Sequence, residues 1–355
     1  MTHTTTTLLG AAAAALLALS ACDSADLVDD EAGLSFRADP WDTGRLNTFF
    51  LGQDHTYPIN AVPIVDDPAA DVRLHAVWTK RCFNEEIGAY YDGELFYTSN
   101  LDGELGITVT NGKLMPATFR KFGDPSTTCT VAGADWLWTV WGVITKDGEA
   151  TKNHYMMILD AAVDENDNPV YEWGVYTGKD DIFVPKTYAK TCDEDKDPNA
   201  DFSLRYHSYL FEGLQVDTDT GAFTANPDQF TVACRAGAIA KAASWGFTPW
   251  EYGFEVQELA TRMVRADYCG DGTPHTEDGT LVQISDIYGQ NAFGEPEGVD
   301  EAAWDLETGA AICVTAPRIG FQDPEVAEFS CGGVALPHCD QLDLSGAEMR
   351  TKNPV

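Results

Sequence analysis

The sequence predicts an α+β fold that is mostly antiparallel β-sheet, with a pair of helices late in the chain and disulfide bonds that staple it. Three observations lead there: strand-like runs punctuated by turn residues from about 41 to 231, helical spacing of apolar residues from 233 to 265, and eight cysteines beyond residue 22. Hydrophobic residues make up 44% of the 355 residues, which is enough to form a substantial core.

Turn signals predict two hairpins in the first half of the chain. Asp92-Gly93 and Asn111-Gly112 each separate two strand-like runs, and all four residues tolerate the positive φ of a type I′ turn. Farther on, the apolar run 136–144 predicts a central strand that turns at Asp147-Gly148 toward the run 155–159. Its three tryptophans are expected in the core: Trp136, Trp138 and Trp141.

The pattern changes to helical near residue 232. The Ala-rich run 233–244 predicts a helix that ends at Trp245, with Gly246 in the left-handed conformation that commonly follows a helix. A second helix is predicted over 251–265, because Val256, Leu259, Ala260 and Met263 recur at helical spacing. A strand is predicted over 280–287, and the tail from 301 is expected to be irregular but cross-linked.

The first 22 residues are typical of an exported lipoprotein. The apolar run 8–19 is too short to cross a bilayer and has the length of a signal-peptide core. It ends in Leu19-Ser20-Ala21-Cys22, which resembles a bacterial lipobox whose cysteine carries diacylglycerol; the alternative is an ordinary secretory signal. We therefore predict a signal peptide over 1–21, lipidation of Cys22 and an acidic tether over 22–40. The expected location is the cell envelope, at the outer membrane or the periplasmic face, with the membrane as partner through the anchor.

The other eight cysteines predict four disulfides. An even number of cysteines in an exported chain favours pairing, although 105 pairings are possible. No C-x2-C spacing occurs, so a zinc site is not indicated. Cys331 and Cys339 enclose a turn-rich segment that could be closed locally. The predicted half-cystines are Cys82, Cys129, Cys192, Cys234, Cys269, Cys313, Cys331 and Cys339.

The charge balance excludes nucleic acid as a default partner. The chain has 57 Asp and Glu against 22 Lys and Arg, a formal net charge of −35, whereas phosphate contacts need clustered Lys and Arg. This balance favours cationic or calcium-bridged partners. Whether the partner is a protein or a glycan stays open at this point.

Calcium is the candidate cofactor. Alternating acidic residues follow Cys192, and carboxylates on a curling loop can converge on one Ca²⁺. Pro198 stands where an EF-hand has Gly, and Leu204 where it has Glu, so this is no EF-hand; a solvated acidic turn is the alternative. The acidic run 164–169 departs from the EF-hand pattern in a similar way. The predicted ligands are Asp193, Asp195, Asp197 and Asp201.

One stretch late in the chain resembles a known family. The runs 231–241 and 245–250 begin the resemblance, and 261–272 followed by His275-Thr276 and Gly279-Thr280 make it specific. This stretch is similar to the ADYC domain, named for the tetrad Ala266-Asp267-Tyr268-Cys269, which occurs in bacterial lipoproteins and is a family of uncharacterised function. The motif residues are Arg262, Arg265, Ala266, Asp267, Tyr268, Cys269, Gly270, Asp271, Gly272 and His275.

The resemblance also implies a domain division and a lost cross-link. Its firm part covers 231–290 and a weaker part reaches from 136 to 339, so we predict a β-rich region over 41–130 and an ADYC-type domain over 131–345. The family pattern often has Cys where this chain has Ala242 and Ala260, one on each predicted helix. The resemblance thus implies the loss of a helix-to-helix disulfide as a unit, which preserves the even cysteine count.

The chemistry of the motif allows two interpretations. Cys269 with His275 and nearby carboxylates could form a thiol nucleophile, but a half-cystine is favoured because exported cysteines oxidise. Arg262, Arg265 and Asp267 are expected to form a buried ion-pair network that attaches the helix to the sheet. No H-E-x-x-H, G-x-S-x-G or nucleotide-binding glycine motif occurs.

The sequence therefore favours a non-enzyme: an exported, lipid-anchored envelope protein that acts as a non-catalytic binding or structural module. The alternatives are an extracytoplasmic hydrolase with a non-contiguous active site and a calcium-dependent adhesion module.

Overall fold

The computed structural model describes most of the chain beyond residue 49. Described are 50–51, 57–58, 62–63 and 72–354, except 85–87, 92, 100–105, 148–149, 179–180, 193, 195–200, 218–219, 277–279, 295–297 and 319–328. The predicted signal peptide, Cys22 and the tether lie outside the described residues. Among the described residues, no helix is long and apolar enough to cross a membrane.

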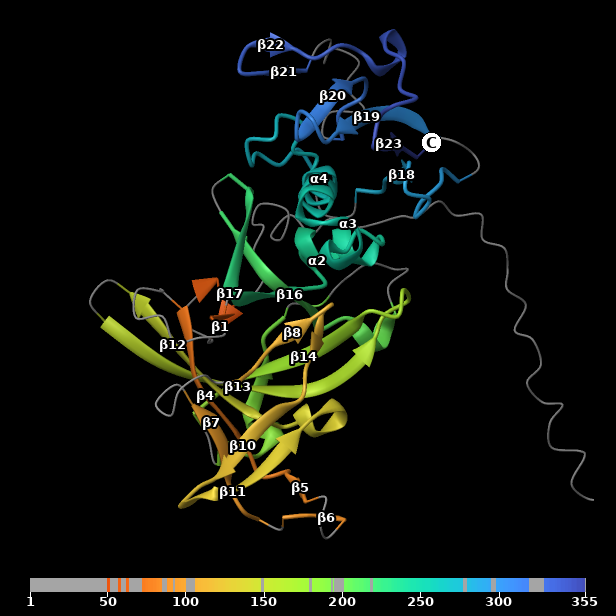
Figure 1. The fold of residues 1–355 in the computed structure, drawn as a ribbon. Helices are drawn as coiled ribbons and strands as arrows, with labels where there is room; N and C mark the ends of the chain where they lie inside the picture. Colours follow the sequence, from red (N-terminus) through yellow and green to blue (C-terminus); the bar gives the residue numbers. More distant parts are fainter. Residues whose placement is uncertain are drawn as a thin grey trace, which may run out of the picture. The chain divides into compact units, whose positions relative to one another are not determined.

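Thirteen strands of the described residues form one antiparallel sheet (Figure 1). Their order is β3-β17-β16-β14-β13-β12-β4-β7-β10-β11-β5-β6, and β15 pairs with β14. The strands are β3 (Val62–Pro63), β4 (Val72–Thr79), β5 (Phe83–Asn84), β6 (Ala89–Tyr90), β7 (Phe96–Ser99), β10 (Ala117–Lys121), β11 (Asp124–Val131), β12 (Val140–Asp147), β13 (Ala150–Val163), β14 (Pro169–Tyr176), β15 (Tyr188–Lys190), β16 (His207–Val216) and β17 (Phe223–Cys234). The sheet takes strands from both sides of residue 131, and the predicted division into domains at that residue stays a prediction.

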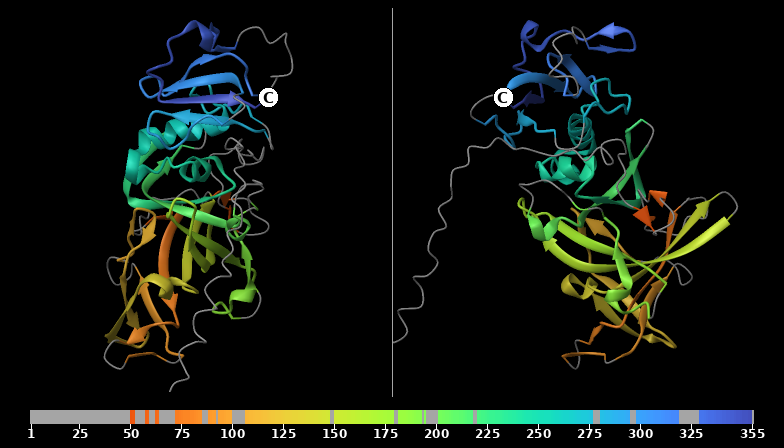
Figure 2. Two further views of the ribbon diagram at one scale, coloured as in Figure 1. Left: turned by 90° about the vertical axis from the view of Figure 1, so that its right-hand side faces the viewer. Right: turned by 180° about the vertical axis from the view of Figure 1, so that it is seen from behind.

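The helices and a second sheet follow β17 (Figure 2). The helices are α2 (Ala238–Ser244), α3 (Pro249–Tyr252) and α4 (Phe254–Arg265). The second sheet is antiparallel in the order β18-β23-β19-β20, from β18 (Gln283–Asp286), β23 (Met349–Asn353), β19 (Val299–Asp305) and β20 (Ala310–Val314). Because α4 contacts both β17 and β19, it connects the large sheet to the small one. The predicted fold class is confirmed.

Short elements complete the described chain. Three two-stranded pairs join β1 (Phe50–Leu51) to β2 (Tyr57–Pro58), β8 (Val109–Thr110) to β9 (Lys113–Leu114), and β21 (Ser330–Cys331) to β22 (Val334–Ala335). The 3₁₀-helices are η2 (Gly133–Trp136), η3 (Pro185–Thr187), η4 (Phe202–Leu204) and η5 (Cys339–Gln341).

The two predicted hairpins have different outcomes. At Asn111-Gly112 both residues have positive φ, 49° and 73°, and β8 pairs with β9 as predicted. At Asp92-Gly93 the hairpin prediction is wrong, because β6 pairs with β5 while β7 pairs with β4 and β10. Both edges of β7 are occupied by strands distant in sequence, and this pairing overrides the local turn signal.

The tryptophan-rich strand begins later than predicted. Residues 133–136 form η2, and β12 starts at Val140 and pairs with β13 as expected. Trp136 and Trp141 are buried and their rings lie 5.8 Å apart in the large core. The prediction is wrong for Trp138, which is 45% exposed at a φ of 66°.

The late helices also differ in their bounds. The first begins at Ala238 instead of 233, because Ala233 and Cys234 end β17 and pair with Tyr209 and Ser208. It ends as predicted at Gly246, whose φ is 95°: the Gly246 N–H bonds to Ala243 O and the Phe247 N–H to Ala242 O, a Schellman motif.

The predicted second helix is divided at Gly253, which has a φ of 85°. Its apolar residues at helical spacing are all buried as expected: Val256, Leu259, Ala260 and Met263. The tail is not irregular as predicted, since it supplies three of the four strands of the second sheet.

Candidate functional site

The ADYC tetrad lies directly after α4 and begins with the residue that ends this helix. Ala266 has a φ of 52°, its N–H bonds to Met263 O, and the Asp267 N–H bonds to Arg262 O. These two bonds form a Schellman motif, in which Gly is usual at the left-handed position. Ala266 is fully buried in the core between α4 and the second sheet, where a methyl group fills space that Gly would leave empty. The backbone cost of a left-handed Ala, about 1 kcal/mol, is therefore offset by packing.

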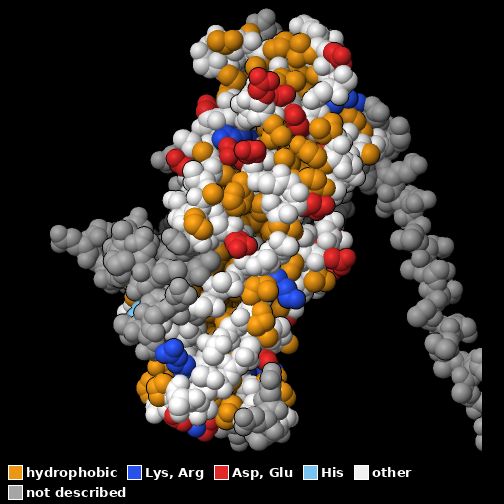
Figure 3. Space-filling view, viewed as in Figure 1, with side chains coloured by type: hydrophobic (Ala, Val, Ile, Leu, Met, Phe, Trp, Pro, Cys, Tyr) orange, Lys and Arg blue, Asp and Glu red, His pale blue; other side chains and the backbone are white. Residues whose placement is uncertain are grey.

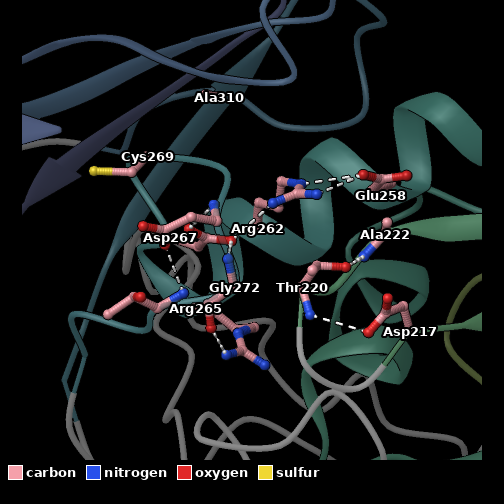
Figure 4. A network of polar contacts seen from close by, with 12 residues as sticks. Asp217, Thr220, Ala222, Glu258, Arg262, Arg265, Asp267, Cys269, Gly272 and Ala310 are labelled. Carbon is pink, nitrogen blue, oxygen red and sulfur yellow. Dashed lines mark hydrogen bonds and ion pairs between the residues drawn. The ribbon is translucent and has the colours of Figure 1, made fainter. Parts of the chain in front are cut away.

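Asp267 accepts hydrogen bonds from three groups around it (Figure 4). Arg262 Nη1 lies 2.9 Å from Oδ2, the Gly272 N–H donates to Oδ2 at 2.9 Å, and the Asp271 N–H donates to Oδ1 at 3.1 Å. Arg262 also binds Glu258 at 2.7 Å. Burial raises the pKa of the Asp267 carboxyl, and Arg262, the charge of Arg265 and the two backbone N–H groups oppose that rise.

Tyr268 connects α4 to the second sheet. Its hydroxyl donates to Glu301 Oε1 of β19 at 2.8 Å and accepts from the Arg318 N–H at 2.8 Å. The ring is stacked on Trp304 at 5.6 Å. Burial raises the pKa of Tyr268 well above its usual value, so the phenol stays protonated.

A buried ion pair beside Tyr268 holds the end of the helix. Arg318 binds Glu301 at 3.0 Å, and both side chains are almost fully buried. Its other guanidinium hydrogens go to Val264 O at 2.7 Å and Met263 O at 3.0 Å, carbonyl groups of the last turn of α4. The Arg318 cation therefore neutralises the Glu301 carboxylate of β19 and also binds the carbonyl groups at the negative end of the α4 dipole.

Cys269 and His275 complete the surroundings of the motif. Cys269 forms a disulfide with Cys331, as the half-cystine prediction requires, and is no free thiol. The His275 ring lies 5.5 Å from the Tyr268 ring and 4.9 Å from Phe329, and its Nδ1 is 3.1 Å from Ala266 O. The histidine is a packing residue here.

A model of one protein family matches residues 132–320, which is more than half of the chain. That family is the ADYC domain. The chain belongs to the ADYC-domain family. No curated protein and no solved structure matches it.

The glycines of the ADYC motif let the loop after the tetrad fold closely against its neighbours. Gly270 has a φ of 67°, and a Cβ there would lie 3.0 Å from Gly309 O. Gly272 has a φ of 88°, and its carbonyl accepts a hydrogen bond from Arg265.

Arg265 differs from the expected ADYC ion-pair network. Arg262 binds Asp267 as predicted, whereas the Arg265 guanidinium donates to Gly272 O and forms no ion pair within contact distance among the described residues. Arg265 is 2% exposed, and its Nε and Nη1 have no partner among the described residues. Burial lowers the pKa of Arg265 to about 10. The attachment of helix to sheet falls instead to Glu301 and Arg318, which no local signal identified because they are far from the motif in sequence.

All eight predicted cysteines are paired. The four disulfides are Cys82–Cys129, Cys192–Cys234, Cys269–Cys331 and Cys313–Cys339. The local Cys331–Cys339 bridge considered from the sequence is therefore wrong. The first two disulfides cross-link the region of the large sheet, and the last two cross-link the C-terminal part of the chain.

The calcium prediction falls mostly outside the described residues, since Asp193, Asp195 and Asp197 are not described. Asp201 is described, and its carboxylate accepts from the Ser203 N–H at 2.8 Å and the Ser203 hydroxyl at 2.7 Å at the start of η4. Within the described part of the chain, no three His, Cys, Asp or Glu side chains gather as metal ligands.

The second acidic run forms a hydrogen-bonded turn. Asp164 is buried and accepts from the N–H groups of Asn166 and Asn168 at 2.9 and 2.7 Å. The Tyr209 hydroxyl donates to its other oxygen at 2.5 Å. These bonds explain the acidic turn without a metal ion.

Proposed function

We propose that this ADYC protein is an exported, lipid-anchored component of the cell envelope that acts as a non-catalytic binding or structural module. The observation that carries the proposal is the internal use of the tetrad. Asp267 is bonded to Arg262 and two backbone N–H groups, Tyr268 to Glu301 and Arg318, and Cys269 to Cys331. Groups that could react are thus committed to holding α4 on the second sheet.

Burial supports the same proposal. Asp267 and Tyr268 are 1% and 0% exposed, so a substrate would have to displace core contacts to reach them. General acid–base catalysis needs a proton-transfer group within hydrogen-bond reach of the reacting atom. The hydrolase alternative would need a site built away from the motif.

The export part of the proposal rests on the disulfides and the leader. Four disulfides are expected in an oxidising compartment outside the cytoplasm. The lipobox-like residues before Cys22 support cleavage there and attachment of lipid, which would hold the protein at a membrane. Acidic side chains are scattered over the face drawn in Figure 3, without one dominant patch, which suits solubility more than a single electrostatic docking site.

The test is an intact mass of protein purified from bacterial membranes, before and after alkylation without reductant. We expect a chain that begins at acylated Cys22 and takes up no alkyl group. The Cys22→Ser variant should remain unacylated and leave the membrane fraction. An unmodified Cys22 in the membrane-bound protein would overturn the anchor.

The non-catalytic part needs a separate test. Fluorophosphonate and iodoacetamide probes label activated Ser and Cys nucleophiles, and we expect neither to modify the native protein. Stoichiometric labelling of a single residue would contradict the proposal and identify the nucleophile.

A further inference from the structure

The outer face of the large sheet carries a continuous row of side chains at the end formed by β10, β11, β5 and β6. Thr118 is opposite Thr130, Thr130 opposite Phe83, and Phe83 opposite Tyr90. Directly opposed residues on antiparallel strands point to the same face. None of the four is buried, so the row lies at the surface and leads from two hydroxyl groups to two aromatic rings.

The aromatic end of this row extends into an exposed platform. Tyr90 and Trp138 are 47% and 45% exposed, and the Arg81 guanidinium lies 5.6 Å from the Tyr90 ring centre and 4.8 Å from that of Trp138. Tyr90 packs edge-on against Phe83 at 5.3 Å, and its hydroxyl donates to Asp135 at 2.6 Å. These contacts hold the two rings in place although both remain open to solvent.

Trp138 has a left-handed backbone conformation, and its ring is exposed to solvent instead of packed in the core. A φ of 66° is rare for a bulky residue and costs about 1–3 kcal/mol. The Trp138 N–H is tied to Ile158 O at 2.8 Å, while Trp136 and Trp141 on either side enter the core. Such strain persists where the surrounding structure imposes it, and it is concentrated at functional sites.

A polar groove adjoins the platform. It has a volume of about 440 Å³ and is lined by Phe83, Asn84, Tyr91, Thr118, Ser126, Thr127, Thr128, Cys129 and Thr130. None of these residues is Asp, Glu, Lys or Arg, but charged side chains border the groove: Arg120 lies opposite Thr128, and Asp124 is bonded to Ser126. The Ser126 and Thr127 hydroxyls donate to Asp124 at 2.6 and 2.7 Å. The lining therefore offers a ligand chiefly the hydroxyl groups of its other threonines, which both donate and accept hydrogen bonds.

The strand below the groove explains this chemistry. Along β11 side chains alternate, so Ser126, Thr128 and Thr130 face outward while Cys129 and Val131 enter the core. The Cys82–Cys129 disulfide joins positions next to Phe83 and Thr130 and so ties the two strands together. A site that is rigid before binding loses less entropy when it binds.

We propose that this face binds a neutral oligosaccharide, with pyranose rings packed on Tyr90 and Trp138 and sugar hydroxyls bonded in the groove. A pyranose presents an apolar C–H face and a rim of hydroxyls, which match flat aromatic rings beside hydroxyl and amide groups. The net charge of −35 disfavours an anionic glycan, which is why the proposal names a neutral one. The inference rests on the proposed function as a binding module and names its ligand class.

The test is a titration of the full lipidated chain, in a detergent without a sugar headgroup, with cellohexaose, chitohexaose, maltohexaose and laminarihexaose. We expect at least one of these sugars to bind and to change the fluorescence of Trp138. Tyr90→Ala and Trp138→Gly should each weaken that binding about tenfold or more, which is about 1.4 kcal/mol. Thr128→Val with Thr130→Val, which keeps the shape but removes two hydroxyls, should weaken it as well.

Phe202→Ala is the matched control. Phe202 is 74% exposed and lies under the Arg205 guanidinium at 4.2 Å, but it does not line the groove. Its loss should leave the affinity unchanged, and unchanged melting temperatures should show that all variants fold.

Absence of binding by all four hexasaccharides would overturn the inference, and so would binding that the groove and platform variants do not affect. Neither result touches the anchor or the non-catalytic proposal, which the mass and labelling experiments test. Cleavage of a bound sugar, seen in its mass after incubation, would instead contradict the non-catalytic proposal.

Discussion

Arg262 and Arg265 lie one turn apart on α4, and both are buried, yet only Arg262 meets a carboxylate. Arg262 binds Asp267 and Glu258, while Arg265 binds one backbone carbonyl. Removing one partner of a buried contact ion pair leaves the other charge uncompensated. Arg265 attracts Asp267 only from beyond contact distance, so its removal loses that weaker attraction and also relieves its own desolvation cost. The two arginines should therefore differ in their contribution to stability.

We predict that Arg262→Met lowers the free energy of unfolding by about 3 kcal/mol, because Asp267 remains buried without its cation. Arg265→Met should change it by less than about 1 kcal/mol, since the lost bond and the relieved desolvation oppose each other. Urea unfolding of both variants measures the difference. Equal losses would contradict this prediction and mean that the attraction between Arg265 and Asp267 stabilises the fold as much as the Arg262–Asp267 contact does.

At the scale of elements, α2 and α4 pack directly on each other through small residues. Ala242 and Ala260 are both fully buried and belong to the same core cluster between the helices and the second sheet. These are the positions at which the family pattern often has Cys. Both positions therefore lie in the core that the two contacting helices share.

We predict that the double variant Ala242→Cys with Ala260→Cys forms a fifth disulfide and raises the free energy of unfolding by up to about 3 kcal/mol. Non-reducing alkylation followed by mass spectrometry should find no free thiol in the double variant. Each single variant should show one thiol, alkylated only after unfolding. Two free thiols in the double variant would show that the helices are too far apart for a bridge.

For the whole molecule, the dominant physical quantity is the net charge of −35. A charge of this size destabilises the folded chain through self-repulsion, which salt screens over roughly 10 Å at 0.1 M. Ion pairs such as Arg318–Glu301 are buried and respond little to salt. The net effect of salt should be set by the exposed carboxylates.

We predict that the melting temperature rises as NaCl increases from about 10 mM to about 200 mM, because screening reduces self-repulsion. If the acidic loop after Cys192 binds calcium, Ca²⁺ should raise it further than Mg²⁺ at equal ionic strength. The variant Asp195→Asn with Asp197→Asn should abolish that difference. Equal effects of the two cations on the parent chain would contradict the calcium prediction.

Much of the fold and part of the site could be predicted because they depend on local physics. Asn111-Gly112 makes a hairpin since both residues accept positive φ, and Gly246 ends a helix for the same reason. The motif residues were identified through resemblance, but Glu301 and Arg318 were not, because nothing near them in sequence marks a partner for Tyr268. The platform residue Trp138 was assigned to the core, since an apolar run does not reveal a left-handed backbone.

The sequence by itself determined the fold class, the two late helices and the presence of four disulfides, because each follows from composition, periodicity or turn chemistry within a short window. The family followed from the resemblance of the motif residues to a known pattern. The tertiary structure decided which cysteines pair, that the tail forms a sheet, and that Asp92-Gly93 is no hairpin. It also decided which of Arg262 and Arg265 meets Asp267. The physical reason is that strand order, burial and ion pairing join residues far apart in the chain, and their energies depend on neighbours that no local window contains.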